Sequence, residues 1–168
     1  KIREICHPDV STEVLISDLK GDSEQLQKII DAAPNILNHN VETVPRLYPE
    51  VRPMADYRRS LKVLETARGL NENLLTKSGL MLGLGERKDE VLSLMKDLLA
   101  VGVDILTIGQ YMQPSLKHHP VVKYVHPDIF RYYHRIGEKM GFKIVESAPL
   151  VRSSYHAERA RELFKERR

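Results

Sequence analysis

Short apolar runs alternate with amphipathic segments along the chain. The apolar runs are strand candidates and occupy residues 13–17, 36–42, 76–84, 105–108 and 144–145. Between them, apolar residues recur every three or four positions, which is typical of a helix with one buried face. This order predicts an α/β fold with a parallel sheet, because consecutive parallel strands need a crossover that a helix usually provides. Periodicity alone fits an open sheet and part of a barrel equally well.

Each of the four predicted helices has a start or stop signal with a known physical cause. The signals are the capping-box pair Asp22 and Gln25 with the breaker Pro34 for the first helix, a start near Ala55 for the second, Gly102 after the third, and Pro127 and Gly141 around the fourth. The chain is therefore predicted to contain four strand-helix pairs, a last strand and a tail.

Residues 36–43 read ILNHNVET and have an unusual polar pattern for a buried strand. Side chains two positions apart on a strand point to the same face, so Asn38, Asn40 and Glu42 are predicted to project together. Buried amides without partners are costly. The pattern favours a ligand site, although each of these residues would equally suit the cap of a following loop.

Other strands of the predicted sheet also end in polar or small residues. In parallel architectures the ligand site lies beyond the carboxyl ends of the strands. Lys77, the glycines of GLMLGLGE and Gln110 are expected at that end. Glycines there would let a flat ligand lie against the backbone, or would simply form a tight turn. The adjacent pair His118 and His119 is more typical of a solvent-exposed loop than of a metal site.

The composition excludes several classes of protein. The chain has 168 residues, of which 42% are hydrophobic and 29% charged, so one domain with its own core is the default. Its 26 basic and 23 acidic residues are interspersed, which disfavours nucleic acid as a partner. No apolar stretch approaches the roughly 20 residues that a membrane span needs. The single cysteine, Cys6, excludes a disulfide framework or a multi-cysteine metal site made by this chain alone.

Four motifs in the chain carry a family resemblance. NHNVETVPRLYPEVRP, TKSGLMLGLGE, VDILTIGQYMQPS with KHHPVVKYVHP, and APLVRSSYHAE occur in this order and closely resemble the lipoyl synthase family. The resemblance implies the carboxyl-terminal part of a partial (β/α)6 barrel of the TIM type. Residues 1–146 would form its later β/α units, with the amino-terminal half absent, and residues 147–168 would form an extension with the RSSY motif and a helical tail. We therefore expect that further polypeptide precedes Lys1.

The resemblance also implies a function. Lipoyl synthases are radical S-adenosylmethionine sulfurtransferases that insert two sulfur atoms at C6 and C8 of an octanoyl-lysine on a lipoyl-domain protein or glycine-cleavage H protein. They use S-adenosylmethionine and two 4Fe-4S clusters, one of which is the sulfur source, with an electron donor such as ferredoxin or flavodoxin. Two cysteine triads hold the clusters, and the single cysteine of this chain cannot replace them. The chain alone is expected to be inactive, and its protein cytoplasmic, or mitochondrial or plastid in a eukaryote.

The family pattern implies roles for residues around S-adenosylmethionine. Asn40 and Glu42 would hold the ribose hydroxyls, because an amide and a carboxylate can donate to and accept from vicinal hydroxyls. Asn38 would lie nearer the substrate. The glycines Gly79 and Gly83 would allow the adenine to approach the strand, with Leu80 and Leu82 as apolar walls. Arg46 would bind the cofactor carboxylate, although it suits a surface ion pair equally well. No side chain is assigned as a general acid or base.

The RSSY motif would supply one ligand of the sulfur-donating cluster. A serine oxygen is a harder ligand than a thiolate and would leave one iron labile, which suits a cluster that is dismantled. Ser153 is the preferred ligand and Ser154 the alternative, while Arg152 would orient the motif or the cluster. Two other interpretations stay open. One is a different sulfur-inserting barrel similar to biotin synthase, against which the motif argues. The other is an inert barrel fragment without the cluster cysteines, whose strand edges would favour association.

Overall fold

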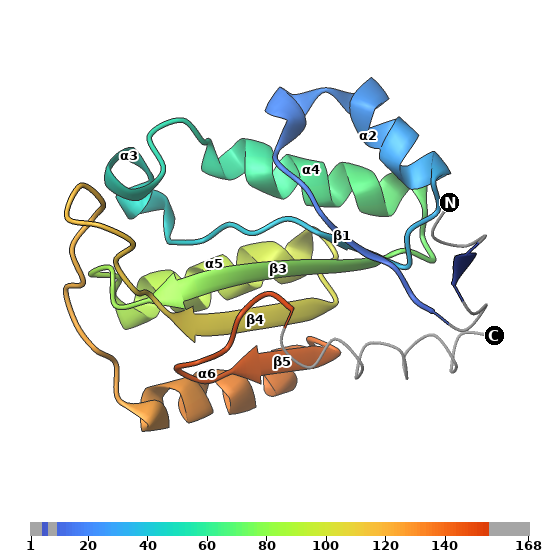
Figure 1. Cartoon of the computed structure of the whole chain (residues 1–168). Helices are drawn as coiled ribbons and strands as arrows, with labels where there is room; N and C mark the ends of the chain where they lie inside the picture. The colour runs from blue at the N-terminus through green and yellow to red at the C-terminus, as the bar shows by residue number, and fades with distance from the viewer. Residues whose placement is uncertain (1–4, 7–9, 155–168) are drawn as a thin grey trace.

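Five strands pair side by side in the order in which they occur along the chain (Figure 1). The structure, a computed structural model, describes residues 5–6 and 10–154. The strands are β1 (Glu13–Leu15), β2 (Ile36–Asn38), β3 (Leu75–Leu82), β4 (Ile105–Gln110) and β5 (Ile144–Ser147). All neighbouring strands run parallel. The predicted α/β class and parallel sheet are therefore confirmed.

Helices connect the strands as the periodicity predicts. They are α2 (Ser23–Asp31), α3 (Tyr48–Val51), α4 (Tyr57–Leu70), α5 (Lys88–Ala100) and α6 (Pro127–Met140), with 3-10 turns at Leu19–Gly21 and Pro45–Leu47. The capping pair of α2 is confirmed, since the Asp22 side chain accepts from the backbone N–H of Gln25 and from its Nε2. Gly141 ends α6 in the left-handed region at φ 111°. None of the helices in the described part of the chain is long and apolar enough to cross a membrane.

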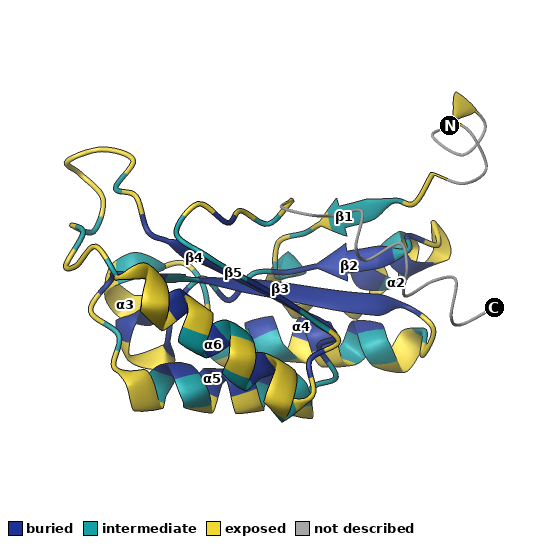
Figure 2. Cartoon of the chain, turned by 90° about the horizontal axis from the view of Figure 1, so that it is seen from below, coloured by how far each residue is buried: buried dark blue, intermediate teal, exposed yellow. Residues whose placement is uncertain are grey.

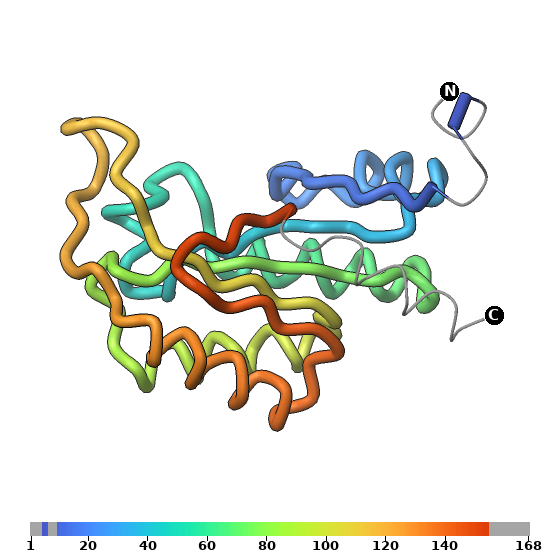
Figure 3. The backbone as a smooth tube through the Cα atoms, turned by 60° about the horizontal axis from the view of Figure 1, so that its bottom comes forward, coloured from blue at the N-terminus to red at the C-terminus, as the bar shows by residue number. Residues whose placement is uncertain are grey.

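The helices lie on one face of the sheet (Figure 2). Alternate strand residues, such as Leu37, Leu106 and Val145, pack against them in one hydrophobic core. The opposite face has no helix among the described residues. Instead, the segment after β5 folds back over it, with the backbone N–H of Gln110 donating to the carbonyl of Pro149 at 3.1 Å (Figure 3). This helix-free face, which we call the inner face, is where the polar strand residues lie.

The inner face is apolar at the amino ends of the strands and polar further along. A small cluster there consists of Ile36, Leu75, Ile105 and Ile144, one residue from each of four strands. One layer above, Lys77 Nζ contacts both carboxylate oxygens of Glu13 at 2.9 and 3.0 Å. Polar residues thus begin in the middle of the strands, not only beyond their ends, and Lys77 is buried within β3.

Candidate functional site

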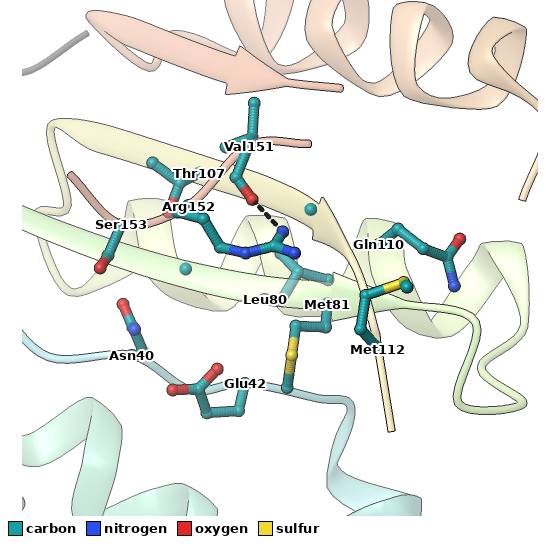
Figure 4. Close-up of a pocket in the computed structure, with 12 residues that line it drawn as sticks. Asn40, Glu42, Leu80, Met81, Thr107, Gln110, Met112, Val151, Arg152 and Ser153 are labelled. Carbon is teal, nitrogen blue, oxygen red and sulfur yellow. Dashed lines mark hydrogen bonds between the residues drawn. The ribbon is translucent and has the colours of Figure 1, made fainter. Parts of the chain in front are cut away.

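A cavity of about 220 Å³ lies on the inner face toward the carboxyl ends of β3 and β4 (Figure 4). Four chain segments form its walls: the residues after β2, strand β3, strand β4 with the residues just beyond it, and the segment after β5. The lining residues are Asn40, Glu42, Gly79, Leu80, Met81, Thr107, Gly109, Gln110, Met112, Val151, Arg152 and Ser153. The carboxyl-end location expected for a parallel sheet therefore contains a cavity.

The segment after β2 reaches this cavity through a bulge and not through a continuous strand. Regular pairing stops at Asn38, opposite Lys77, and resumes in a single bridge between Glu42 and Leu80. Four positions separate Asn38 from Glu42, whereas three separate their partners, so this segment contains one extra residue. Glu42 is also left-handed, with φ 65°. The prediction of an unbroken strand over residues 36–42 was wrong at its second half.

The bulge divides the three polar residues that simple alternation placed together. Asn40 and Glu42 line the cavity. Asn38 lies one layer deeper, where its Nδ2 donates to Glu13 Oε1 at 3.0 Å, and it is fully buried. Asn38 is not a lining residue of this cavity, because the regular strand ends there and the chain then changes course. Its predicted substrate role is not tested by this placement.

Asn40 crosses the cavity floor over Gly79. A Cβ at position 79 would lie 2.5 Å from Thr107 Oγ1 and 3.0 Å from Asn40 Oδ1, so only glycine leaves room for both side chains. Asn40 Oδ1 is itself buried and has no hydrogen-bond partner in the described structure. Such an atom is costly unless a ligand or a water supplies a donor. The cavity thus presents an unsatisfied acceptor.

Glu42 places a carboxyl group next to this acceptor. Burial raises the pKa of the Glu42 carboxyl, while the Asn40 side chain and the positive charge of Arg52 act in the opposite direction. The backbone around it is fixed from both sides, since Glu42 N–H donates to Gly79 O at 2.9 Å and Met81 N–H donates to Glu42 O at 2.8 Å. A carboxyl group on a fixed backbone beside an unsatisfied amide oxygen suits a ligand with adjacent hydroxyl groups.

The segment after β5 closes the opposite side of the cavity. Ala148 N–H donates to Ile108 O at 3.2 Å, and the Val151 carbonyl packs directly on Gly109. This brings Arg152 and Ser153 to the cavity, with Arg152 Nη1 bonded to the Val151 carbonyl at 2.7 Å. In Figure 4, Ser153 and Asn40 lie toward the same end of the view, and Gln110 and Met112 lie toward the other. Ser154 is exposed and does not line it, and Tyr155 and the predicted helical tail lie outside the described residues.

Two predicted cofactor residues lie away from the cavity. Arg46 makes a two-point contact with Glu90, at 2.7 and 3.0 Å, and also donates to Gly85 O. Hydrogen bonding from Arg46 lowers the pKa of Glu90 to about 2. Gly83 forms the turn after β3 at φ 101° and packs against Gln110. In this structure Arg46 therefore forms an ion pair and Gly83 forms a tight turn, as the alternative interpretations of these residues predicted.

Several cavity residues were not singled out from the sequence. Met81, Thr107, Gly109 and Met112 line it, and Leu80 does so while Leu82 packs in the core. The period of two along β3 and β4 could have found the first three, because Gly79, Met81, Thr107 and Gly109 share the inner face. Met112 and the bulge contact of Arg52 had no local signal, since they depend on loop geometry.

Metal ligands are sparse in the described part of the chain. No group of three or more His, Cys, Asp or Glu side chains there could hold a metal ion. The two adjacent histidines diverge: His118 Nδ1 contacts Ser115 Oγ, and His119 Nε2 contacts Leu84 O. Cys6 is exposed. Among the predicted metal ligands, Ser153 faces the cavity.

A parallel α/β sheet with helices on one face and a polar cavity at the carboxyl ends of its strands is typical of barrel-type folds. Residues 1–98 match the radical SAM superfamily, and the chain belongs to this superfamily. The predicted membership of this superfamily and the predicted fold class are thereby confirmed.

Within the superfamily, the chain is similar to lipoyl synthases. The lipoyl synthase of Caldicellulosiruptor saccharolyticus is 54% identical over 158 residues, which cover 94% of this chain and 55% of the relative. That of Phocaeicola vulgatus is 56% identical over 91% of this chain and 53% of the relative. That of Aquifex aeolicus is 52% identical over 89% and 54%. The chain spans about half the length of the curated relatives it matches.

Proposed function

We propose that the chain belongs to a lipoyl synthase, a radical S-adenosylmethionine sulfurtransferase that inserts two sulfur atoms at C6 and C8 of a protein-bound octanoyl-lysine. Identity of about half of all residues with enzymes of that name supports the proposal. The RSSY motif argues against the alternative of a biotin-synthase-like sulfur-inserting enzyme. The substrate would be an octanoylated lipoyl-domain protein or glycine-cleavage H protein, with ferredoxin or flavodoxin as electron donor.

The observation that carries the proposal is the pairing of Asn40 and Glu42 in one cavity. Both residues line this cavity, Asn40 Oδ1 has no hydrogen-bond partner among the described residues, and glycine at position 79 leaves room for the Asn40 side chain. These groups fit the ribose of S-adenosylmethionine, whose two hydroxyls both donate and accept. Arg46 and Gly83 have no part in this arrangement, because neither lines the cavity.

When bound, S-adenosylmethionine supplies the radical chemistry, and the chain's own residues bind it, orient it and exclude water. Asn40 and Glu42 would fix the ribose. Met81 and Met112 line the cavity with unbranched apolar side chains that can close around a ligand. An exclusion of water protects a reactive centre from side reactions. No described residue is needed as a general acid or base.

Ser153 is the one residue here that we propose as an iron ligand. It lines the cavity, whereas the neighbouring Ser154 does not, which favours Ser153 over the alternative. The described residues contain no three-ligand metal group, so the remaining ligands of any cluster would come from other parts of a lipoyl synthase. The described portion alone is therefore expected to bind S-adenosylmethionine without forming a cluster.

Calorimetric titration of the chain with S-adenosylmethionine tests the cofactor site. Glu42→Gln is expected to weaken binding by about tenfold, the order of one hydrogen bond to a charged group. Glu72→Gln is the matched control, since Glu72 is exposed and does not line the cavity. Equal affinities for the three proteins would remove Glu42 from the site.

The serine assignment needs a protein that carries the clusters. In a chimera that joins the preceding part of a lipoyl synthase to this chain, Ser153→Ala is expected to abolish sulfur insertion into an octanoylated lipoyl domain. Ser154→Ala is expected to retain it. Mass spectrometry of the acyl-lysine measures both. The reverse result would transfer the ligand role to Ser154, and full activity of both variants would remove it from the motif.

A further inference from the structure

The motif YPEVRP contains an arginine, Arg52, that the proposed site does not use. Arg52 caps the carboxyl end of α3 and is not a lining residue of the cavity. Its Nη1 lies 3.1 Å from the carbonyl oxygen of Asn40, 3.3 Å from that of Val41 and 3.3 Å from the Tyr48 hydroxyl. The contacts with the main chain are made from outside the cavity, at the bulge that carries the site.

This bulge needs external support. Its extra residue removes carbonyl groups from the regular ladder, and buried carbonyls require partners. In addition, Glu42 adopts φ 65°, a conformation that costs a non-glycine residue free energy and persists only where the surroundings enforce it. Pairing with Gly79 and Met81 holds the downstream side of the turn.

Arg52 and Tyr48 hold the upstream side. The Tyr48 hydroxyl donates to Val41 O at 2.8 Å, and Arg52 reaches the carbonyls of both Asn40 and Val41. The guanidinium lies 5.5 Å from the centre of the Tyr48 ring, which orients it. The carbonyls immediately before the strained residue are therefore bound by one planar, permanently charged group.

We infer that Arg52 is a positioning residue: by binding the carbonyls of Asn40 and Val41, it holds the left-handed turn that directs Asn40 and Glu42 into one cavity. The ligand of that cavity rests on the proposed function, whereas the hold on the turn does not. All three contacts come from the single nitrogen Nη1, and the guanidinium lies over the Tyr48 ring. A lysine keeps the positive charge, but its ammonium lacks the planar face that this ring orients, so it is not expected to hold the nitrogen at the same point.

The charges around the turn are few. Arg52 is the cation that acts on the Glu42 carboxyl, and Arg152 lines the same cavity. Burial, and to a smaller extent the charge of Glu42, raises the pKa of the Tyr48 phenol. His39 directly precedes Asn40, and burial lowers its pKa, with the charges of Arg52 and Asp18 acting on it in opposite directions. A lysine at position 52 would preserve the charge of Arg52 and lose only the geometry.

Amide hydrogen exchange of the chain, followed by NMR, tests the hold directly. The N–H groups of Glu42 and Met81 are both bonded in the turn. In Arg52→Lys and Arg52→Gln they are expected to exchange at least about tenfold faster, on the scale of one lost charge-assisted bond. The amides of α6 are expected to keep their rates. Arg58→Gln is the control, because Arg58 is exposed and makes no contact with the turn.

Two exchange results would overturn the inference. Unchanged rates at Glu42 and Met81 would show that the turn holds itself. A uniform increase that includes α6 and follows a lower Tm would show that Arg52 acts only on global stability.

Titration with S-adenosylmethionine separates this inference from the proposed function. Arg52→Lys is expected to bind about tenfold more weakly than the parent chain, and Arg58→Gln equally well. If the parent chain binds no S-adenosylmethionine, the proposed function fails while the exchange rates still decide the role of Arg52. If the turn loosens in Arg52→Lys and the affinity stays unchanged, the link between turn and ligand is refuted.

Discussion

The carbonyl oxygen of Val151 lies against Gly109 where any other residue would place its Cβ. This contact seats the segment after β5 on the inner face of the sheet, together with the bond from Gln110 N–H to Pro149 O. Ser153 follows two residues later. The position of this proposed iron ligand therefore depends on residue 109 of β4 being a glycine. A single methyl group at position 109 would therefore act on a residue it does not touch.

Gly109→Ala is expected to lower the free energy of unfolding by about 1–3 kcal/mol, the usual cost of overpacking a filled site. The overlap is with backbone, which cannot rotate away as a flexible side chain could. Urea unfolding of the chain measures the effect. The control is Gly69→Ala on α4, where nothing lies within 4 Å of the added Cβ. The control is expected to be stabilised by up to about 1 kcal/mol. Equal stability of Gly109→Ala and the parent would mean that the segment adapts freely.

The pH dependence of the free energy of unfolding should reveal the cost of burying the Glu42 carboxylate. Burial raises its pKa in the folded state, so folding is favoured when the carboxyl is protonated and loses that contribution as pH rises through the raised pKa. Glu42→Gln is therefore expected to be more stable than the parent at neutral pH. The difference should vanish below the ordinary glutamate pKa of about 4.3. Urea unfolding at several pH values measures it.

Binding of S-adenosylmethionine should show the opposite trend. If the ribose hydroxyls donate to the Glu42 carboxylate, affinity rises with pH through the same raised pKa, and Glu42→Gln loses this dependence. The ionised Glu42 carboxyl would thus lower the free energy of unfolding while it strengthens the binding of S-adenosylmethionine. A flat affinity profile for the parent chain would contradict the ionised role of Glu42.

Sequence patterns predicted the elements well and the site in part. Among residues 10–154, hydrophobic periodicity and capping residues identified every strand and helix except the short turns and α3, because those patterns follow directly from burial on one face. They did not predict the bulge between Asn38 and Glu42, which is set by the register against β3. Alternation therefore placed Asn38 in the cavity, although the structure pairs it with Glu13. Arg52 and Met112 depend on loops whose course no local pattern determines.

The buried pair of Glu13 and Lys77 gives a further test of the inner face. Lys77 is 3% exposed and Glu13 20%. Removing one partner of a buried pair typically costs about 3–5 kcal/mol, because the other charge stays uncompensated. Glu13→Leu leaves Lys77, the more deeply buried of the two charges, without its carboxylate partner. It is therefore expected to destabilise the chain more than Lys77→Met. The double variant should be more stable than Glu13→Leu, and urea unfolding of all four proteins measures the coupling. Additive effects would indicate that the two charges are independent.

The last prediction concerns the floor of the cavity. There the side chains of Thr107 and Asn40 fill the space that a side chain at position 79 would need. A Cβ at position 79 would lie 2.5 Å from Thr107 Oγ1 and 3.0 Å from Asn40 Oδ1. Gly79→Ala must therefore displace one of these side chains, and since the Asn40 side chain is the more open of the two, we expect weaker binding of S-adenosylmethionine. Thr107→Ala removes the closer obstacle, so the double variant Gly79→Ala, Thr107→Ala should recover most of the affinity. Calorimetric titration of the single and double variants measures this compensation. If the double variant binds no better than Gly79→Ala, the floor is needed for direct contact with the ligand and not for the placement of Asn40.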